Sequence, residues 1–173
     1  MKEATVPING LRDALEQDIA KSLDMDGHVA KLEKLRLLFG HSIEALQFDE
    51  PPQECNCVMH ALDFRMEHPT TPLGRFFANT LYLGWLIERD VLTLIEGEPM
   101  AGSLAVYYVG GKVEHVGVVQ SSGRIVSKWG IGMLCEHEPF EVPSSYGSKI
   151  RYFVAIDPDT AWELLAAFHN WRR

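Results

Sequence analysis

The chain has 173 residues, 46% of them hydrophobic and 23% charged, a composition typical of one globular domain with a core of its own. Sixteen basic residues against 24 acidic ones give a net charge of −8, and no basic stripe is present to neutralise phosphates, so we expect no binding to nucleic acid. The amino terminus lacks the apolar core of a signal peptide, and the most apolar segment, 76–87, falls short of the roughly 20 residues that span a bilayer, so we expect a soluble cytoplasmic protein that does not bind membranes.

Two helices are expected at the start of the chain. Asn9 can cap the first, in which apolar residues repeat every four positions over 11–23. A second apolar stripe runs over 29–39, and 42–48 is expected to add a short helix. The sequence therefore predicts a helical N-terminal extension over residues 1–50, with no chemistry in it.

The remainder of the chain, 51–173, is predicted to form the core domain. One helix is expected to begin at Cys57, a buried helix is expected over 73–92, and an amphipathic helix over 160–170 closes the chain. The segments with the composition of strands are 103–109, 112–120, 124–129, 134–142 and 149–156. Helices, then an antiparallel sheet, then one more helix make an α+β fold.

Cys57 is the residue around which we expect the chemistry to be organised. Pro51 and Pro52 precede it, and the apolar residues that follow have helical spacing, so the cysteine is expected in a first helical turn. Unpaired backbone N–H groups and the helix dipole favour an anion there, and the thiolate is the reactive form of cysteine. We therefore predict that Cys57 is a nucleophile. Gln53, four positions upstream, is a candidate donor to an oxyanion, together with the Cys57 backbone N–H.

His115 is predicted to be the base that takes the thiol proton and returns it to the leaving group. In a strand its side chain shares a face with Gly117, where the missing side chain leaves room for the cysteine-bearing helix. A turn at 121–123 brings Ser127 opposite His115, so Ser127 is the candidate that orients the imidazole. The alternatives for this third position are Lys128, Glu136 and His137.

These segments resemble a known family. Residues 56–62 look like the nucleophile helix of bacterial papain-like proteins, and 102–107 with 111–119 resembles the histidine hairpin of their NlpC-like and CHAP-type branches. The resemblance covers about residues 51–156. It implies a papain-like fold and a thiol hydrolase, an amidase or peptidase that works through an acyl-enzyme without a cofactor. Matching the hairpin strand to strand also puts Ser127 at the third catalytic position.

Other interpretations stay open at this point. The family motif Asp-Cys-Ser-Gly can also be matched to 54–57, which makes Cys55 the nucleophile. A serine at the third position motivates a second hypothesis, a catalytically inactive papain-like protein that binds a partner. The third is a zinc-stabilised domain, with ligands drawn from Cys55, Cys57, His60, Cys135 and His137. The expected partner is a peptide or amide substrate, and neither its identity nor the oligomeric state can be read from the sequence.

Overall fold

The computed structural model describes residues 6–19, 25–46, 55–64, 78–130 and 132–171. Over these residues the chain forms five α-helices and one seven-stranded antiparallel sheet, so the predicted α+β class is confirmed. The strand order across the sheet is β1-β6-β5-β4-β3-β7-β2. No helix in the described part of the chain is both long enough and apolar enough to cross a membrane.

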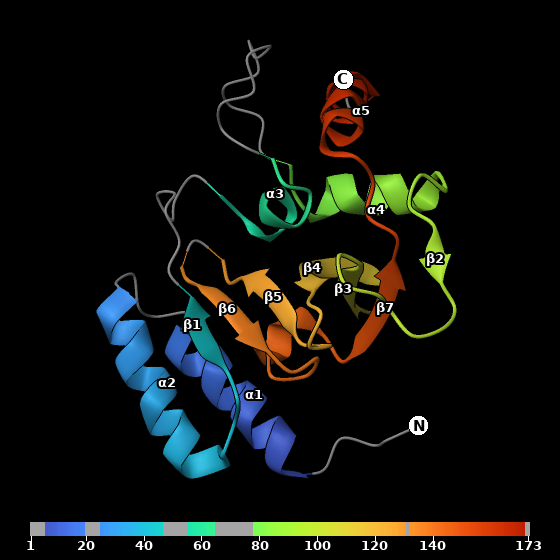
Figure 1. The fold of residues 1–173 in the computed structure, drawn as a ribbon. Coiled ribbons are helices and arrows are strands. Elements are labelled where there is room, and N and C mark those ends of the chain that lie inside the picture. The colour runs from blue at the N-terminus through green and yellow to red at the C-terminus, as the bar shows by residue number, and fades with distance from the viewer. Residues whose placement is uncertain (1–5, 20–24, 47–54, 65–77, 131, 172–173) are drawn as a thin grey trace.

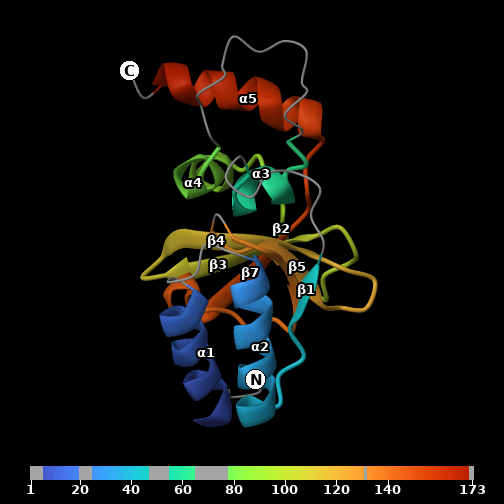
Figure 2. The ribbon, with the colours of Figure 1, turned by 90° about the vertical axis from the view of Figure 1, so that its left-hand side faces the viewer.

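The helices form two layers, one on each side of the sheet. They are α1 (Val6–Ile19), α2 (Met25–Phe39), α3 (Cys57–Ala61), α4 (Thr80–Glu88) and α5 (Pro158–Trp171). The strands are β1 (Glu44–Leu46), β2 (Leu94–Ile95), β3 (Leu104–Val109), β4 (Lys112–Val119), β5 (Ile125–Lys128), β6 (Leu134–His137) and β7 (Lys149–Phe153). In Figures 1 and 2, α3, α4 and α5 lie on one side of the sheet, and α1 and α2 lie on the other.

The sheet separates two hydrophobic cores. Successive side chains of a strand point to opposite faces, so neighbouring residues join different cores. Val106 and Val116 pack into the core under α3, α4 and α5, and we name this side the α3 face. Tyr107 and Val119 pack into the core against α1 and α2, on what we name the α1 face.

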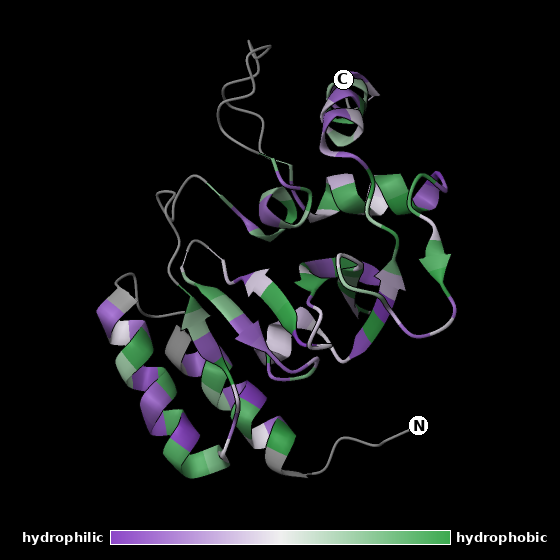
Figure 3. Cartoon of the chain, in the orientation of Figure 1, coloured by the Kyte–Doolittle hydropathy of each residue, from purple (hydrophilic) through white to green (hydrophobic). Residues whose placement is uncertain are grey.

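Helix α4 agrees with the prediction of a buried helix, although it is shorter than expected. It begins after Asn79, whose side-chain oxygen accepts from the N–H groups of Leu81 (3.1 Å) and Tyr82 (3.2 Å). Figure 3 shows hydrophobic colours along most of α4, whereas hydrophilic and hydrophobic residues alternate on α1 and α2. The start of the predicted segment, 73–77, lies outside the described residues.

The predicted short helix over 42–48 is wrong, because residues 44–46 form strand β1 at the edge of the sheet. The hydrogen-bonding edge of β6 favours an extended partner over one helical turn. The pairs are Glu44↔Glu136, Ala45↔Cys135 and Leu46↔Leu134. The predicted extension thus supplies a strand of the sheet, and its helices share the core on the α1 face.

Candidate functional site

Helix α3 begins at Cys57, as predicted, and Asn56 is its N-cap. The Asn56 side-chain oxygen accepts from the N–H groups of Val58 (2.9 Å) and Met59 (3.0 Å). Its side-chain nitrogen donates to the carbonyl oxygen of Ala78 at 2.7 Å. These bonds satisfy two orphan donors of the first turn and tie the start of α3 to the chain just before α4.

Replacing Asn56 with alanine is expected to lower the free energy of unfolding by about 1 kcal/mol, because the first turn of α3 loses its cap. Urea denaturation followed by tryptophan fluorescence measures the change. Asn79→Ala is the matched control, since the Asn79 side-chain oxygen likewise accepts from two N–H groups in the first turn of α4. Only Asn56→Ala should also change the alkylation rate of Cys57. Identical alkylation in both variants would contradict the structural link between cap and thiol.

The thiol of Cys57 lies against the α3 face of the sheet, where α3 packs on β4 and β5. Burial raises its pKa above the ordinary value for cysteine. The backbone N–H groups of Val116, Val58 and Cys57 itself, and the charge of Lys128, act in the opposite direction and lower this pKa. Cys57 is thus partly buried, and the backbone N–H groups and Lys128 near it favour the anionic form of its sulfur.

Lys128 also belongs to the α3 face and is completely buried. Its neighbour two positions back, Val126, is paired with Val118, which packs into the core under α3. Burial lowers the pKa of Lys128, and the nearby thiols of Cys55, Cys135 and Cys57 raise it. The ammonium also donates to the carbonyl oxygen of Gly132.

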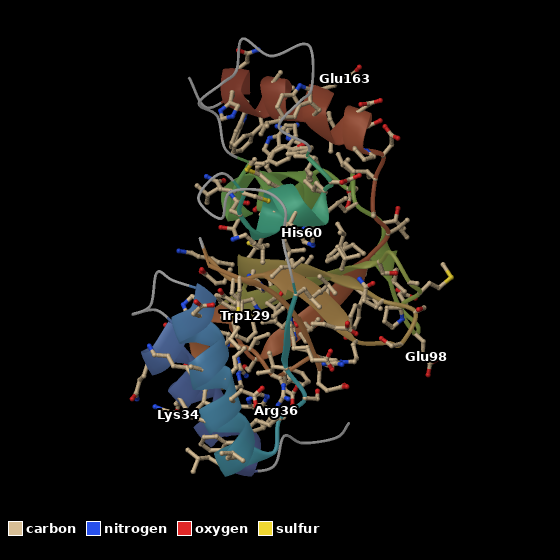
Figure 4. The ribbon with its side chains drawn as sticks, turned by 60° about the vertical axis from the view of Figure 1, so that its left-hand side comes forward. Lys34, Arg36, His60, Glu98, Trp129 and Glu163 are labelled. Atoms are coloured by element: carbon tan, nitrogen blue, oxygen red, sulfur yellow. The ribbon has the colours of Figure 1, made fainter. Side chains whose placement is uncertain are left out.

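His60 is a second polar group beside Lys128. Burial lowers the pKa of His60, the carboxylate of Asp63 raises it, and the charge of Lys128 lowers it further. Figure 4 shows His60 on the α3 side of the sheet and Trp129 on the side that faces α2. The thiol of Cys57 and the imidazole of His60 thus lie on the α3 side of the sheet, and the charge of Lys128 acts on both.

The predicted meeting of the Cys57 thiol with the His115 imidazole does not occur. His115 is paired with Tyr107, which packs on the α1 face, and its ring stacks on Tyr146 with the two ring centroids 3.9 Å apart. His115 is only 1% exposed, and its Nε2 has no hydrogen-bond partner among the described residues. Burial and the charge of His137 hold its pKa well below the usual value. The base and the nucleophile of the predicted pair therefore lie on opposite faces of one sheet.

The space beside Gly117 is used differently from the prediction. We expected it to admit the cysteine-bearing helix, but it admits strand β5. A Cβ atom at Gly117 would lie 2.5 Å from Cγ2 of Ile125, 2.8 Å from Cβ of Ser127 and 2.9 Å from the carbonyl oxygen of Val126. Gly117 therefore allows β4 and β5 to approach closely on the α1 face.

Ser127 does hydrogen-bond an imidazole, but the imidazole is that of His137 (2.8 Å). Nδ1 of His137 lies 2.8 Å from the carbonyl oxygen of Glu138, and a carbonyl only accepts, so Nδ1 carries the proton. Nε2 then accepts from the Ser127 hydroxyl, which in turn accepts from Nε1 of Trp129 at 2.9 Å. Burial lowers the pKa of His137 to about 4, so this buried network holds a neutral imidazole.

The remaining candidates are distributed over both faces of the sheet. Cys55 is buried in the core under α3, Cys135 is buried in the core on the α1 face, and Glu136 forms an ion pair with Arg124 at 3.8 Å. Gln53 lies outside the described residues. Among the residues that the structure describes, no three His, Cys, Asp or Glu side chains come together as a metal site. The residues suggested as zinc ligands are thus divided between two faces.

Lys128 is the residue whose position the sequence analysis missed, because it was considered only as a partner for His115. A signal was present in the run Ile125-Val126-Ser127-Lys128-Trp129. With Ser127 on the His115 face, strict alternation puts the lysine on the opposite face, which a helix covers. A lysine is almost never fully buried unless a partner is present, so its burial marks this position as unusual.

Comparison with known proteins gives no match. No protein-family model matches the sequence, and no curated protein or solved structure matches the chain. The resemblance to papain-like proteins therefore depends on the motif residues alone.

Proposed function

We propose that this chain is a papain-like thiol hydrolase in which Cys57 attacks an amide carbonyl and Lys128, in place of His115, exchanges the proton. A short helix that begins at the cysteine and packs on an antiparallel sheet fits this architecture. The observation that carries the proposal is the surroundings of the sulfur. Three backbone N–H groups, those of Val116, Val58 and Cys57, and the buried Lys128 lower the pKa of the Cys57 thiol against the larger effect of burial.

The chemistry follows from these two side chains. Burial lowers the pKa of Lys128, so its amine exchanges a proton more readily than that of an exposed lysine. As the sulfur bonds to the carbonyl carbon, the thiol proton moves to the Lys128 amine, as in hydrolases that use a serine and a lysine. The carbon–nitrogen bond then breaks, and the lysine returns this proton to the leaving amine. Water hydrolyses the resulting thioester, with the lysine again accepting and returning a proton.

A specific observation favours a second candidate function, the catalytically inactive binding protein. Burial outweighs the groups that stabilise the thiolate, so the pKa of Cys57 is raised overall. His115, which was expected to activate it, is enclosed on the other face. On this hypothesis Cys57 and Lys128 are structural core residues, and the papain-like scaffold serves to bind a partner.

Alkylation of the folded protein by iodoacetamide separates the two functions. Mass spectrometry would follow Cys57, with buried Cys55 and Cys135 as internal controls. A hydrolase predicts that Cys57 reacts at least about tenfold faster than the other two at pH 7.5, and that Lys128→Met slows it about tenfold, the effect of one pKa unit. His115→Phe is the matched control and should leave the rate unchanged. Slow labelling of Cys57 that Lys128→Met does not alter would instead support the binding protein.

A second readout tests the acyl-enzyme directly. With p-nitrophenyl acetate as the probe, an active thiol releases a burst of one equivalent of p-nitrophenolate per chain. The burst should disappear in Cys57→Ser and persist in Cys135→Ser. Absence of a burst in the unmodified chain, whose melting temperature shows that it is folded, would reject the hydrolase proposal.

A further inference from the structure

An open cavity of about 690 Å³ lies apart from the Cys57 site, at the far end of the β3–β4 hairpin. Its walls come from α1, from the hairpin turn and from the segment that leads into β7. Neither Cys57, His60 nor Lys128 lines it. The volume falls within the range of small-molecule sites, roughly 300–1,000 Å³.

Arg12 supplies a buried cation to this cavity. The residue is only 6% exposed, and its Nε donates to the carbonyl oxygen of Val142 at 3.2 Å. Its Nη2 donates to the carbonyl oxygens of Pro143 (3.5 Å) and Gly147. All three acceptors are uncharged, so they position the guanidinium without neutralising it.

The other terminal nitrogen of Arg12 is left for a ligand. Nη1 makes no hydrogen bond to any described residue, and it is not among the fully enclosed polar atoms that lack a partner. It is therefore within reach of solvent, and Arg12 is one of the residues that line the cavity. A fixed guanidinium edge of this kind is suited to carboxylate and phosphate oxygens.

A second cation and several neutral donors complete the cavity wall. Lys149 is exposed at the start of β7 and forms no ion pair with any described residue. Asp13 is the single carboxylate in the lining, so the wall carries two positive charges against one negative charge. This local excess of +1 stands out in a chain whose net charge is −8. The uncharged residues of the lining with polar side chains are Asn9, Tyr108, Ser144 and Ser148.

We propose that this cavity binds a small molecule that carries an oxyanion, a carboxylate or a phosphate, against Arg12 and Lys149. The cavity is larger than a bare anion needs, so the ligand also has a polar body that the Asn9 amide and the serine hydroxyls can hydrogen-bond. Gly110 and Gly111, which also line the cavity, form the hairpin turn with φ of 56° and 86°, a conformation that favours glycine.

Titration of the full chain with inorganic phosphate, and separately with citrate, tests the proposal by ¹H–¹⁵N NMR. We expect saturable shifts of the backbone amides at Gly110, Gly111 and Ser148 with at least one probe. Lys149→Gln should weaken that binding up to about tenfold, the effect of one charge-assisted contact. Asp13→Asn should strengthen it, because the competing carboxylate is removed. A response to citrate alone identifies a carboxylate ligand, and a response to phosphate alone identifies a phosphate ligand.

Lys34→Gln on α2 is the matched control, since it removes the same charge from an exposed position that does not line the cavity. It should leave the affinity unchanged. Saturation by neither probe would overturn the proposal, as would equal weakening by Lys34→Gln and Lys149→Gln, which would mean unspecific attraction to charge. Arg12 is not substituted in this test, because its bonds connect α1 to the 142–147 segment and a loss of folding would hide the result.

Discussion

Replacing Gly117 with alanine is expected to lower the free energy of unfolding by about 3 kcal/mol, at the upper end of the usual cost of overpacking a core. The added methyl group would meet Cγ2 of Ile125 at 2.5 Å and Cβ of Ser127 at 2.8 Å. The side chain of Ile125 is stiff at χ1, and Cβ of Ser127 is fixed to the backbone of β5, so neither can turn away. The two strands must separate on the α1 face, where Ser127 also bonds His137.

The matched control is Gly97→Ala, because an added Cβ at Gly97 has no atom within 4 Å and its backbone is not in the left-handed region. Its stability should stay within about 0.5 kcal/mol of the unmodified chain. Urea denaturation of the two variants gives the comparison. Equal stability of Gly117→Ala and Gly97→Ala would mean that the space beside Gly117 is not filled by β5.

Most of the strands could be predicted from the sequence, because their signals are local. The pair Gly110-Gly111 between two β-branched and aromatic runs predicts the β3–β4 hairpin, and the register places Val109 opposite Lys112 across that turn. Strand β1 has no such signal, since three residues take their conformation from the edge of β6. Its formation depends on a partner some ninety positions away, which no local pattern contains.

For the candidate site, too, the features set by local sequence could be predicted and those set by long-range packing could not. The start of α3 at Cys57 was predictable, and the preceding Asn56 is a strong N-cap that supports it. Ser127 does lie on the α1 face with His115, but it lies beside Gly117 and not opposite His115, and it bonds His137. The face on which α3 would pack was not predictable, since both faces of β4 are buried and both can receive a helix. The prediction of a Cys57–His115 pair was wrong for this reason.

The same geometry gives the α1 face a chemical character of its own. His115 and His137 are both buried there, next to the aromatic rings of Tyr146 and Trp129. Each imidazole is neutral, because burial removes the water that would solvate a positive charge and so lowers the pKa. In the folded protein both histidines therefore stay unprotonated in the core. A catalytic base, in contrast, must be able to take up a proton.

Acidification from pH 7.5 to 4.5 is expected to remove roughly 2.5 kcal/mol of stability through His137 alone. Its pKa falls from 6.5 in the unfolded chain to about 4 in the folded one, so below pH 6.5 the unfolded state takes up a proton that the folded state does not. The stability is therefore fully present above pH 6.5 and is lost as the pH falls towards 4. Burial has the largest effect on the pKa of His137. The hydrogen bond to the Glu138 carbonyl and the carboxylate of Glu141 raise it, and the guanidinium of Arg124 lowers it. His115 shifts in the same direction and adds to the loss.

Urea denaturation at the two pH values measures the loss, and the readout is the difference between them, because substitutions in the core also change the absolute stability. His137→Gln should reduce the difference by about 2.5 kcal/mol, since glutamine does not titrate. His115→Phe should reduce the difference as well, because phenylalanine does not titrate. The ring can keep the stack on Tyr146, and it replaces an Nε2 that has no partner in the described chain. Lys34→Gln, which changes an exposed charge on α2, should leave the difference as it is. If both histidine variants lost as much stability in acid as the unmodified chain, the imidazoles would titrate as they do in water. His115 and His137 would then not be enclosed on the α1 face.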